Sequence, residues 1–296
     1  MNSNFTKSKT TELPRMVKVG HGVINEVGNV CRELHLESPA LIVADEITKV
    51  IAGDTVEKIL ADIGYEVQQI LISDSDQNNI DEVKRQITEL KAKFALGVGG
   101  GKSIDVAKCA SFECYSPFLS IPTAASHDGI VSSRASIMVD GKRKSLTART
   151  PLAVVADTQI IASSPYRLLA AGCGDVIANI TAVLDWKLAK RLRNEEFSSS
   201  ASMLADITGK FMLDNSELIK PGLEESSWYV AKALVSSGVA MSIAGSSRPA
   251  SGAEHKFSHA LDEIAEKPGL HGEQCGVGAI MTMYLHGGNW ERIREA

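Results

Sequence analysis

The sequence predicts an α/β domain built on a doubly wound parallel sheet, followed by an all-helical domain. In the first half of the chain, short apolar segments typical of strands buried on both faces alternate with segments of helical periodicity. Beyond about residue 160 the strand-like segments cease and helical periodicity dominates. We place the boundary at "ASSPYR" and predict one domain at residues 1–162 and a second at residues 163–296.

The strands of the first domain are predicted from short, continuous apolar segments. Four of them are residues 40–45, 65–72, 94–100 and 117–123. Between the second and third, the segment "NNIDEVKRQITELKAK" has helical periodicity, and Asn79 is its predicted N-cap. Residues 134–148 predict a β-hairpin around Asp140-Gly141, and residues 153–157 predict one more strand.

Composition excludes several classes of function. The chain has 296 residues and a formal net charge of −5, which argues against general affinity for nucleic acid or for an anionic membrane. No apolar segment approaches the roughly 18 to 20 residues needed to span a bilayer. The five cysteines are scattered and form no C-x-x-C motif, as expected in a reducing cytoplasm. We expect residues 1–15 to be a polar extension without a signal peptide.

Three consecutive glycines connect the predicted strand 94–100 to a helix. Glycines allow the backbone to approach a phosphate closely, and the free amides at a helix start favour an anion. Neither G-x-x-x-x-G-K-[ST] nor G-x-G-x-x-G fits the segment "ALGVGGGKS", so a plain tight turn is the alternative. We predict pyrophosphate binding here. A second turn of small residues, 121–133, is expected at the same edge of the sheet.

Three histidines lie close together in the second domain. His255 and His259 are four residues apart on a helix predicted to begin near residue 251, so they share one face. His271 directly precedes the next predicted helix. Such imidazoles can bind a divalent cation, usually zinc, but surface histidines also show this spacing by chance. The spacing leaves both interpretations open.

Asp175 is the carboxylate candidate for such a site. It follows Gly172 and Gly174, and we interpret it as lying at the start of a helix. An acidic residue in a first helical turn can simply complement the helix dipole, so this role also stays open.

The chain resembles the sn-glycerol-1-phosphate dehydrogenases, which belong with glycerol dehydrogenase, iron-type alcohol dehydrogenases and dehydroquinate synthase. The resemblance runs from about residue 16 to the last residue. It rests on the segments "GVGGGKSIDVAK", "PTAASHDGIVSSRASI", "RTPLAVVADTQII", "GCGDVIANITAVLDWKLA", "SSRPASGAEHKFSHALD" and "HGEQCGVGAIMTMYLH". It implies an NAD- or NADP-dependent oxidoreductase, requiring one Zn²⁺ per chain, that makes the backbone of archaeal membrane phospholipids. It also implies a cytoplasmic homo-oligomer with a small-molecule substrate.

The resemblance also implies residue roles. Asp175, His255 and His271 would hold zinc, and Asp128, Asp175 and His259 would contact substrate, His259 as part of a proton relay. The cofactor would lie on Gly99, Gly100, Gly101, Lys102, Ser103, Thr123, Ala124, Ala125, Ser126, Ser132 and Asp45. The substrate phosphate would require cations, and the basic residues nearest the matching motifs are Lys144, Arg149 and Arg248.

Three alternatives remain at this point. Glycerol dehydrogenase is chemically close but uses an uncharged substrate. A dehydroquinate synthase-like cyclase would carry glutamate in place of Asp175, together with a lysine-rich catalytic set. A cofactor-binding fragment without turnover is the non-enzyme alternative, because family members usually continue beyond the position of Ala296 and the second domain therefore resembles a C-terminally truncated one.

Overall fold

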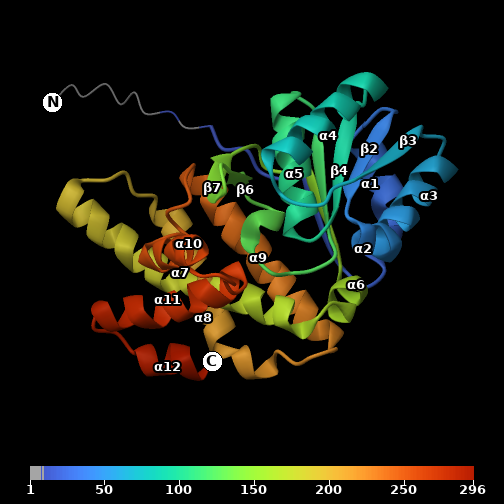
Figure 1. Cartoon of the computed structure of the whole chain (residues 1–296). Helices are drawn as coiled ribbons and strands as arrows, with labels where there is room; N and C mark the ends of the chain where they lie inside the picture. Colours follow the sequence, from blue (N-terminus) through green and yellow to red (C-terminus); the bar gives the residue numbers. More distant parts are fainter. Residues whose placement is uncertain (1–7, 9) are drawn as a thin grey trace.

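The computed structural model describes residue 8 and residues 10–296. More than half of the predicted polar extension therefore lies outside the described residues. A parallel α/β part is followed by an all-helical part, so the predicted fold class is confirmed (Figure 1). After residue 157, the described chain contains helices and connecting loops but no strand.

The sheet has six parallel strands in the order β1-β8-β5-β4-β2-β3. The strands are β1 (Met16–Gly20), β2 (Ala40–Ala44), β3 (Val67–Leu71), β4 (Phe94–Gly99), β5 (Phe118–Pro122) and β8 (Ala153–Asp157). The four inner strands are buried along their whole length, which explains their continuous apolar sequences. Strand β1 was not predicted. It is an edge strand of partly exposed residues and pairs only with β8 in the sheet.

Helices cover both faces of this sheet, as in a doubly wound fold. On β2, Leu41 and Val43 pack into one core with the helices α4 and α5, whereas Ala40 and Ile42 pack into another with α1 and α3. The helices of this part are α1 (Val27–Glu33), α2 (Glu46–Thr48), α3 (Asp54–Asp62), α4 (Gln77–Leu90) and α5 (Gly101–Glu113), with 3₁₀ turns at Val23–Glu26 and Asp128–Ile130 and a π-helical turn at Lys49–Gly53. The hairpin β6 (Arg134–Val139) and β7 (Lys142–Thr147) turns at Asp140-Gly141, as predicted.

The N-cap of α4 corrects one prediction. Asp76, rather than Asn79, caps the helix, because its carboxylate accepts a hydrogen bond of 2.8 Å from the Asn79 amide. Asn79 is the third residue inside the helix.

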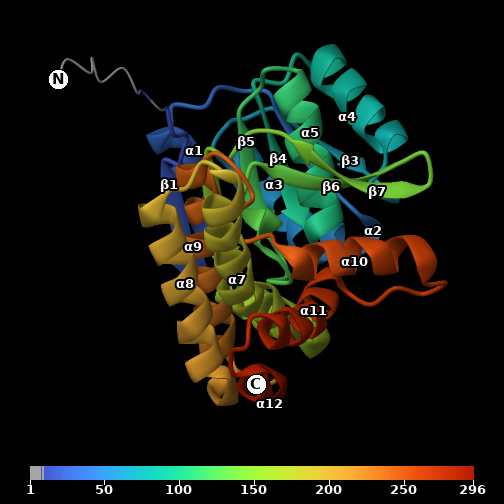
Figure 2. The ribbon, with the colours of Figure 1, turned by 90° about the vertical axis from the view of Figure 1, so that its left-hand side faces the viewer.

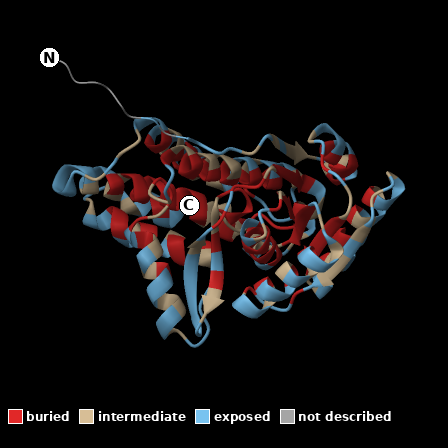
Figure 3. Ribbon diagram, turned by 90° about the horizontal axis from the view of Figure 1, so that it is seen from above, coloured by how far each residue is buried: buried red, intermediate tan, exposed pale blue. Residues whose placement is uncertain are grey.

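The second part is a bundle around one long helix. Its helices are α6 (Thr158–Ser163), α7 (Tyr166–Arg193), α8 (Ser199–Asp214), α9 (Glu224–Ala244), α10 (Ala253–Ile264), α11 (His271–Leu285) and α12 (Trp290–Glu295), with a 3₁₀ turn at Ser216–Leu218. Contrary to the expectation that no apolar segment approaches membrane-spanning length, helix α7 is long and apolar enough to cross a membrane by length and composition; 72% of its most apolar window is buried inside the protein, as in a core helix. Buried residues run through the interiors of both parts (Figure 3).

Two glycines allow α7 to approach its neighbours backbone to backbone. A Cβ atom on Gly172 would lie 2.1 Å from the Ala125 carbonyl oxygen, and one on Gly174 would lie 2.5 Å from the Gly272 carbonyl oxygen. These glycines are inside the helix, so Asp175 is in its interior and not at its start as predicted. The glycines mark close contacts, which a sequence pattern does not distinguish from a helix start.

Candidate active site

A cavity of about 820 Å³ lies between the sheet edge and the helical part. The turns after β4 and β5 line it, together with the hairpin, helix α10 and the start of α11. Figure 2 shows α10 directly below the hairpin and α11 below α10. The predicted site residues that line the cavity are Asp45, Gly100, Gly101, Lys102, Ala124, Ser126, Asp128, Ser132, Arg248, His255, His259 and His271.

The glycine turn presents the start of α5 to the cavity. Gly99 has a φ of +152°, and a Cβ atom there would lie 2.7 Å from the Ser103 hydroxyl oxygen. Gly100 is the N-cap and, as a glycine, has no side chain to cap the first amides of the helix. Gly100, Gly101 and Lys102 line the cavity, so the start of this helix faces it, and free helix-start amides favour an anion. Ser103 is fully buried behind them.

The second turn lies beside the first. The Thr123 amide donates a hydrogen bond of 3.0 Å to the Gly99 carbonyl, which joins the two strand ends. Ala124, Ser126 and Ser132 line the cavity, whereas Thr123 and Ala125 are buried behind its surface. Asp45, at the end of β2, caps α2 through hydrogen bonds of 3.0 and 2.7 Å from the next helical amides.

A buried lysine ties the glycine turn's helix to the neighbouring segments. The Lys108 ammonium on α5 donates hydrogen bonds of 2.6 Å to the carbonyls of both Gly129 and Arg134, and one of 3.2 Å to Asp105. Asp105 in turn accepts a hydrogen bond of 2.9 Å from the Ser136 amide. Helix α5, the turn 128–130 and strand β6 are therefore fastened at one buried point.

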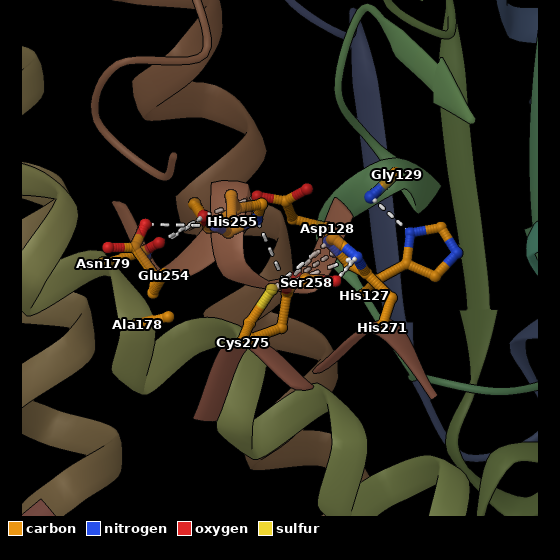
Figure 4. Close-up of polar contacts among 12 residues, drawn as sticks. His127, Asp128, Gly129, Ala178, Asn179, Glu254, His255, Ser258, His271 and Cys275 are labelled. Atoms are coloured by element: carbon orange, nitrogen blue, oxygen red, sulfur yellow. Dashed lines mark hydrogen bonds and ion pairs between the residues drawn. The ribbon is translucent and has the colours of Figure 1, made fainter. Parts of the chain in front are cut away.

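At the helical end of the cavity, three helices bring the Asp175 carboxylate and the imidazoles of His255 and His271 together. Figure 4 shows the two imidazoles. Asp175 Oδ1 lies 3.7 Å from His255 Nε2 and 3.6 Å from His271 Nε2. Its other oxygen, Oδ2, accepts a hydrogen bond of 2.9 Å from the Asp128 amide. Oδ1 is buried without a hydrogen-bond partner in the described chain. One carboxylate oxygen is thus held in place while the other faces two ring nitrogens, an arrangement that fits a divalent cation.

Neighbouring side chains orient both imidazoles. Glu254 Oε1 lies 3.1 Å from His255 Nδ1, and Ser258 Oγ lies 3.1 Å from His271 Nδ1. The Ser258 hydroxyl also donates a hydrogen bond of 2.7 Å to Gln274. Because each Nδ1 has a partner, each Nε2 is directed at Asp175, as is usual for metal-bound histidines.

The two imidazoles of this group have opposite electrostatic environments. Burial, then the charge of His255, lowers the pKa of His271 well below its ordinary value. For His255, burial lowers the pKa, but the acidic groups of Cys275, Glu254 and Asp175 outweigh it and raise the pKa well above 6.5. His255 therefore favours its protonated form and His271 its neutral form.

The predicted catalytic residues adjoin this group. The ring centres of His259 and His271 are 6.3 Å apart, and His259 is not one of the clustered potential ligands. Burial and the nearby His255 lower the pKa of His259. Asp128 accepts a hydrogen bond of 2.9 Å from Ser237. Burial, together with the charge of Asp175, raises the pKa of Asp128 to about 7.

The structure does not bring all the predicted phosphate-binding cations to the cavity. Lys144 does not line the cavity, because alternate residues of a strand face opposite sides. Its Nζ atom lies 3.7 Å from Asp140 Oδ2. The adjacent residue Arg143 lines the cavity instead. Arg149 is also outside the lining and pairs with Glu12.

Arg248 does line the cavity, although its guanidinium is paired with Glu195 through two hydrogen bonds.

Two further residues of the site were not singled out from the sequence. Cys275 belongs to the same cluster of potential metal ligands as Asp175. The sequence feature that could have indicated it is its spacing of four residues from His271, which places both on one helix face. His127 lines the cavity beside the glycine turn and accepts a hydrogen bond of 3.0 Å from the Gly129 amide. The sequence feature that could have indicated His127 is its position next to Asp128.

Known proteins similar to this chain are dehydrogenases of one family. A family model for iron-containing alcohol dehydrogenases matches residues 18–165. A glycerol-1-phosphate dehydrogenase [NAD(P)+] of Methanosarcina mazei is 56% identical over 99% of this chain and 82% of its own length. The corresponding protein of Methanothermobacter thermautotrophicus is 52% identical over 96% of this chain and 82% of its own length.

Solved structures show the same fold. A probable glycerol dehydrogenase from Sinorhizobium meliloti superposes with a TM-score of 0.80 at 20% identity, covering 97% of this chain and 81% of that one. Glycerol dehydrogenase from Schizosaccharomyces pombe also gives a TM-score of 0.80 at 20% identity, covering 98% of this chain and 75% of that one.

Proposed function

Because the chain belongs to the glycerol-1-phosphate dehydrogenases, we propose that it reduces dihydroxyacetone phosphate to sn-glycerol-1-phosphate with NADH or NADPH. The product would supply the glycerophosphate backbone of archaeal membrane phospholipids. The observation that carries the proposal is one cavity with an anion-binding helix start at one end and the group Asp175, His255 and His271 at the other. A nicotinamide cofactor and a polarised ketone can meet between these two ends.

The cofactor diphosphate would lie on the amides of Gly99 to Ser103. Exposed amides at the start of α5 supply hydrogen bonds and the positive end of the helix dipole, and Lys102 adds a charge. The segments Thr123–Ser126 and Ser132 would border the nicotinamide. Asp45, at the end of a neighbouring strand, would face the adenosine ribose.

Asp175, His255 and His271 would hold one Zn²⁺, which supplies a Lewis acid that polarises the substrate carbonyl. The unpartnered Asp175 Oδ1 and the two Nε2 atoms are the donor atoms available for it. Glu254 and Ser258 keep those nitrogens directed inward by binding the other nitrogen of each ring.

His259 would deliver the proton that the forming alcohol requires. It lies on the same face of α10 as His255, lines the cavity and is not held by the metal group. Its lowered pKa makes it a ready proton donor when it is protonated. Asp128 would position the substrate hydroxyl from the opposite side, since its backbone is fixed to Asp175 and its carboxylate to Ser237.

The substrate phosphate would bind Arg143. This residue lines the cavity, and its charge is close enough to His271 to contribute to the lowered pKa of that imidazole. Arg248 would be a second partner only if it left Glu195. Charge-assisted hydrogen bonds contribute roughly 1.5 to 3 kcal/mol each, enough to favour the phosphorylated ketone by about 10²-fold or more with two of them.

The proposal also includes the wider setting of the enzyme. We assign cofactor binding to residues 1–162 and metal and substrate binding to residues 163–296, in a cytoplasmic homo-oligomer. The five free cysteines accord with a reducing compartment.

Steady-state kinetics of the zinc-loaded protein tests the proposal. We expect a much higher kcat/KM for dihydroxyacetone phosphate than for dihydroxyacetone, with either NADH or NADPH, and chiral analysis should identify sn-glycerol-1-phosphate. Equal efficiency with both ketones would contradict phosphate recognition. Formation of sn-glycerol-3-phosphate, or absence of turnover in protein shown to hold zinc and cofactor, would contradict the proposed reaction.

A further inference from the structure

The hairpin of β6 and β7 has one face toward the protein core and one toward the cavity. On β6, Ala135 and Ile137 are buried and belong to the core that contains α4 and α5. Successive residues of a strand alternate between faces, and directly opposite residues of paired strands share a face. The other face therefore consists of three opposite pairs, which are Arg134 with Thr147, Ser136 with Ser145, and Met138 with Arg143. Four of its residues line the cavity, namely Arg134, Ser136, Arg143 and Ser145.

The two arginines of this face have no acidic partner within the part of the chain that the structure describes. Arg143 donates a hydrogen bond of 3.4 Å to the Ser75 hydroxyl, and Arg134 donates to hydroxyls and a carbonyl. Burial without a counter-charge lowers the pKa of Arg134. Other basic residues nearby do have carboxylate partners, which are Glu263 for Lys142, Asp140 for Lys144 and Glu195 for Arg248. The cavity thus contains two guanidiniums whose charge an anionic ligand would balance.

Hydrogen bonds across the hairpin hold the Arg134 guanidinium in place. Its Nε atom donates to the Ser145 hydroxyl at 3.1 Å, and one terminal nitrogen donates to the Ser145 carbonyl at 2.7 Å. The other terminal nitrogen donates to the Thr147 hydroxyl. These bonds use three of the five N–H donors of a guanidinium, so two remain for a ligand. Because the Ser145 hydroxyl accepts from Arg134, its own proton can be donated to the same ligand.

The backbone of Arg134 is attached to the metal end of the cavity. Its carbonyl accepts a hydrogen bond of 2.6 Å from Lys108, which also holds the turn of Asp128. The Asp128 amide in turn donates to Asp175, a proposed zinc ligand. Arg134 therefore lies on the substrate side of the cavity, on the hairpin face that it shares with Arg143, the proposed phosphate ligand.

We propose that Arg134 is a second cation for the substrate phosphate, acting together with Arg143 and the Ser145 hydroxyl. The inference rests on the proposed function, which supplies the phosphorylated ketone. A phosphate monoester carries about −1.5 to −2 charges at pH 7 and has three strong acceptor oxygens. Two guanidiniums and a hydroxyl match it in charge and in number of donors. Arg134 is then a specificity-determining residue, because it recognises the group that distinguishes dihydroxyacetone phosphate from dihydroxyacetone.

Kinetics and binding measurements on Arg134→Met test this role. We expect the ratio of kcat/KM for dihydroxyacetone phosphate to that for dihydroxyacetone to fall about 10 to 10²-fold, as for one lost charge-assisted hydrogen bond. Calorimetric titration of inorganic phosphate into NADH-saturated protein should show a similar loss of affinity. The Kd for NADH, from nicotinamide fluorescence, should stay at the wild-type value. Arg134→Lys retains the charge without the fork of donors, so it should lose less than Arg134→Met.

Lys144→Met is the matched control, because it removes a positive charge from the same hairpin outside the lining of the cavity. It should retain the wild-type ratio and the wild-type affinity for phosphate. An equal loss with both ketones in Arg134→Met would mean that Arg134 only supports the hairpin, and this would overturn the inference. A loss confined to NADH affinity would assign Arg134 to the cofactor diphosphate and would overturn it as well.

The wild-type protein separates failure of this inference from failure of the proposed function. If the wild type prefers dihydroxyacetone phosphate and Arg134→Met keeps the whole preference, the inference fails and the proposed function stands. If the wild type turns over both ketones equally well, phosphate recognition fails, and the inference fails with it.

Discussion

The two ends of the cavity are built in different ways. The end where we propose cofactor binding is built mainly from two short segments that follow neighbouring strands, residues 99–103 and 123–132. The end where we propose metal binding consists of side chains from the three helices α7, α10 and α11. Main-chain geometry follows from local sequence, because glycines and strand ends determine it. A ligand set from separate helices exists only when those helices pack correctly.

The largest effect should follow from removing a ligand at the metal end. His271→Ala deletes one of the two ring nitrogens that face Asp175 and leaves two of the three proposed metal ligands. We expect loss of bound zinc and a fall in kcat/KM of at least about 10³-fold, since Lewis-acid stabilisation contributes several kcal/mol. Metal analysis after dialysis, together with kinetics, checks this. Full metal content and full activity in this variant would exclude His271 as a ligand.

His259→Ala separates catalysis from metal binding within the same end. His259 shares the α10 face with His255 but lies outside the ligand cluster. The variant should retain zinc and lose about 10² to 10⁴-fold in kcat, the usual range for general acid–base groups. Zinc loss in His259→Ala would instead make this residue a ligand.

At the cofactor end a smaller effect is expected. A Cβ atom in Gly101→Ala would lie 2.3 Å from His127 Nε2, so the ring or the helix start must move. We expect the KM for the reduced cofactor to rise about tenfold, equivalent to the loss of roughly one hydrogen bond. Zinc content should stay at the wild-type level. A parallel loss of zinc would show that the two ends are not independent.

The smallest effect concerns an exposed contact between the two parts. His21, after β1, lies 3.0 Å from Glu224 at the start of α9, and this hydrogen bond raises the pKa of His21. A histidine with a raised pKa stabilises the fold fully below its ordinary pKa of 6.5, and this stabilisation is lost as the pH rises through the raised value. His21→Ala should therefore lower Tm slightly at pH 5.5 and leave it unchanged well above the raised pKa. An equal difference at both pH values would contradict this role.

Local patterns predicted the sheet and its glycine turn, because buried parallel strands and glycine-rich turns have distinctive sequences. The same patterns misplaced Asp175. Gly172 and Gly174 suggested a helix start, whereas they allow close contact with Ala125 and Gly272, which are distant in the sequence. Packing between distant segments leaves no periodic signal, so the proposed metal ligands were predicted from the family resemblance rather than from spacing.

The choice between Lys144 and Arg143 shows a similar limit. Both are basic residues of β7, but only Arg143 lines the cavity. Which face of a two-stranded hairpin meets a cavity depends on how the hairpin packs against the rest of the protein. Strand β7 is exposed and mainly polar, so its sequence has no alternation of apolar residues that would indicate the face.

Lys108 has a consequence for substrate selection. Its ammonium joins α5, which begins at the glycine turn, to the turn of Asp128 and to β6, which pairs with the strand that carries Arg143. The proposed anchor points for cofactor and phosphate are therefore tied to the same buried lysine. With the phosphate on Arg143, as proposed, the site would select ketones by the distance between their carbonyl and their phosphate. A ketone with one more carbon between carbonyl and phosphate would be held with its reactive carbon displaced from the nicotinamide, and selectivity for chain length would arise without a dedicated pocket.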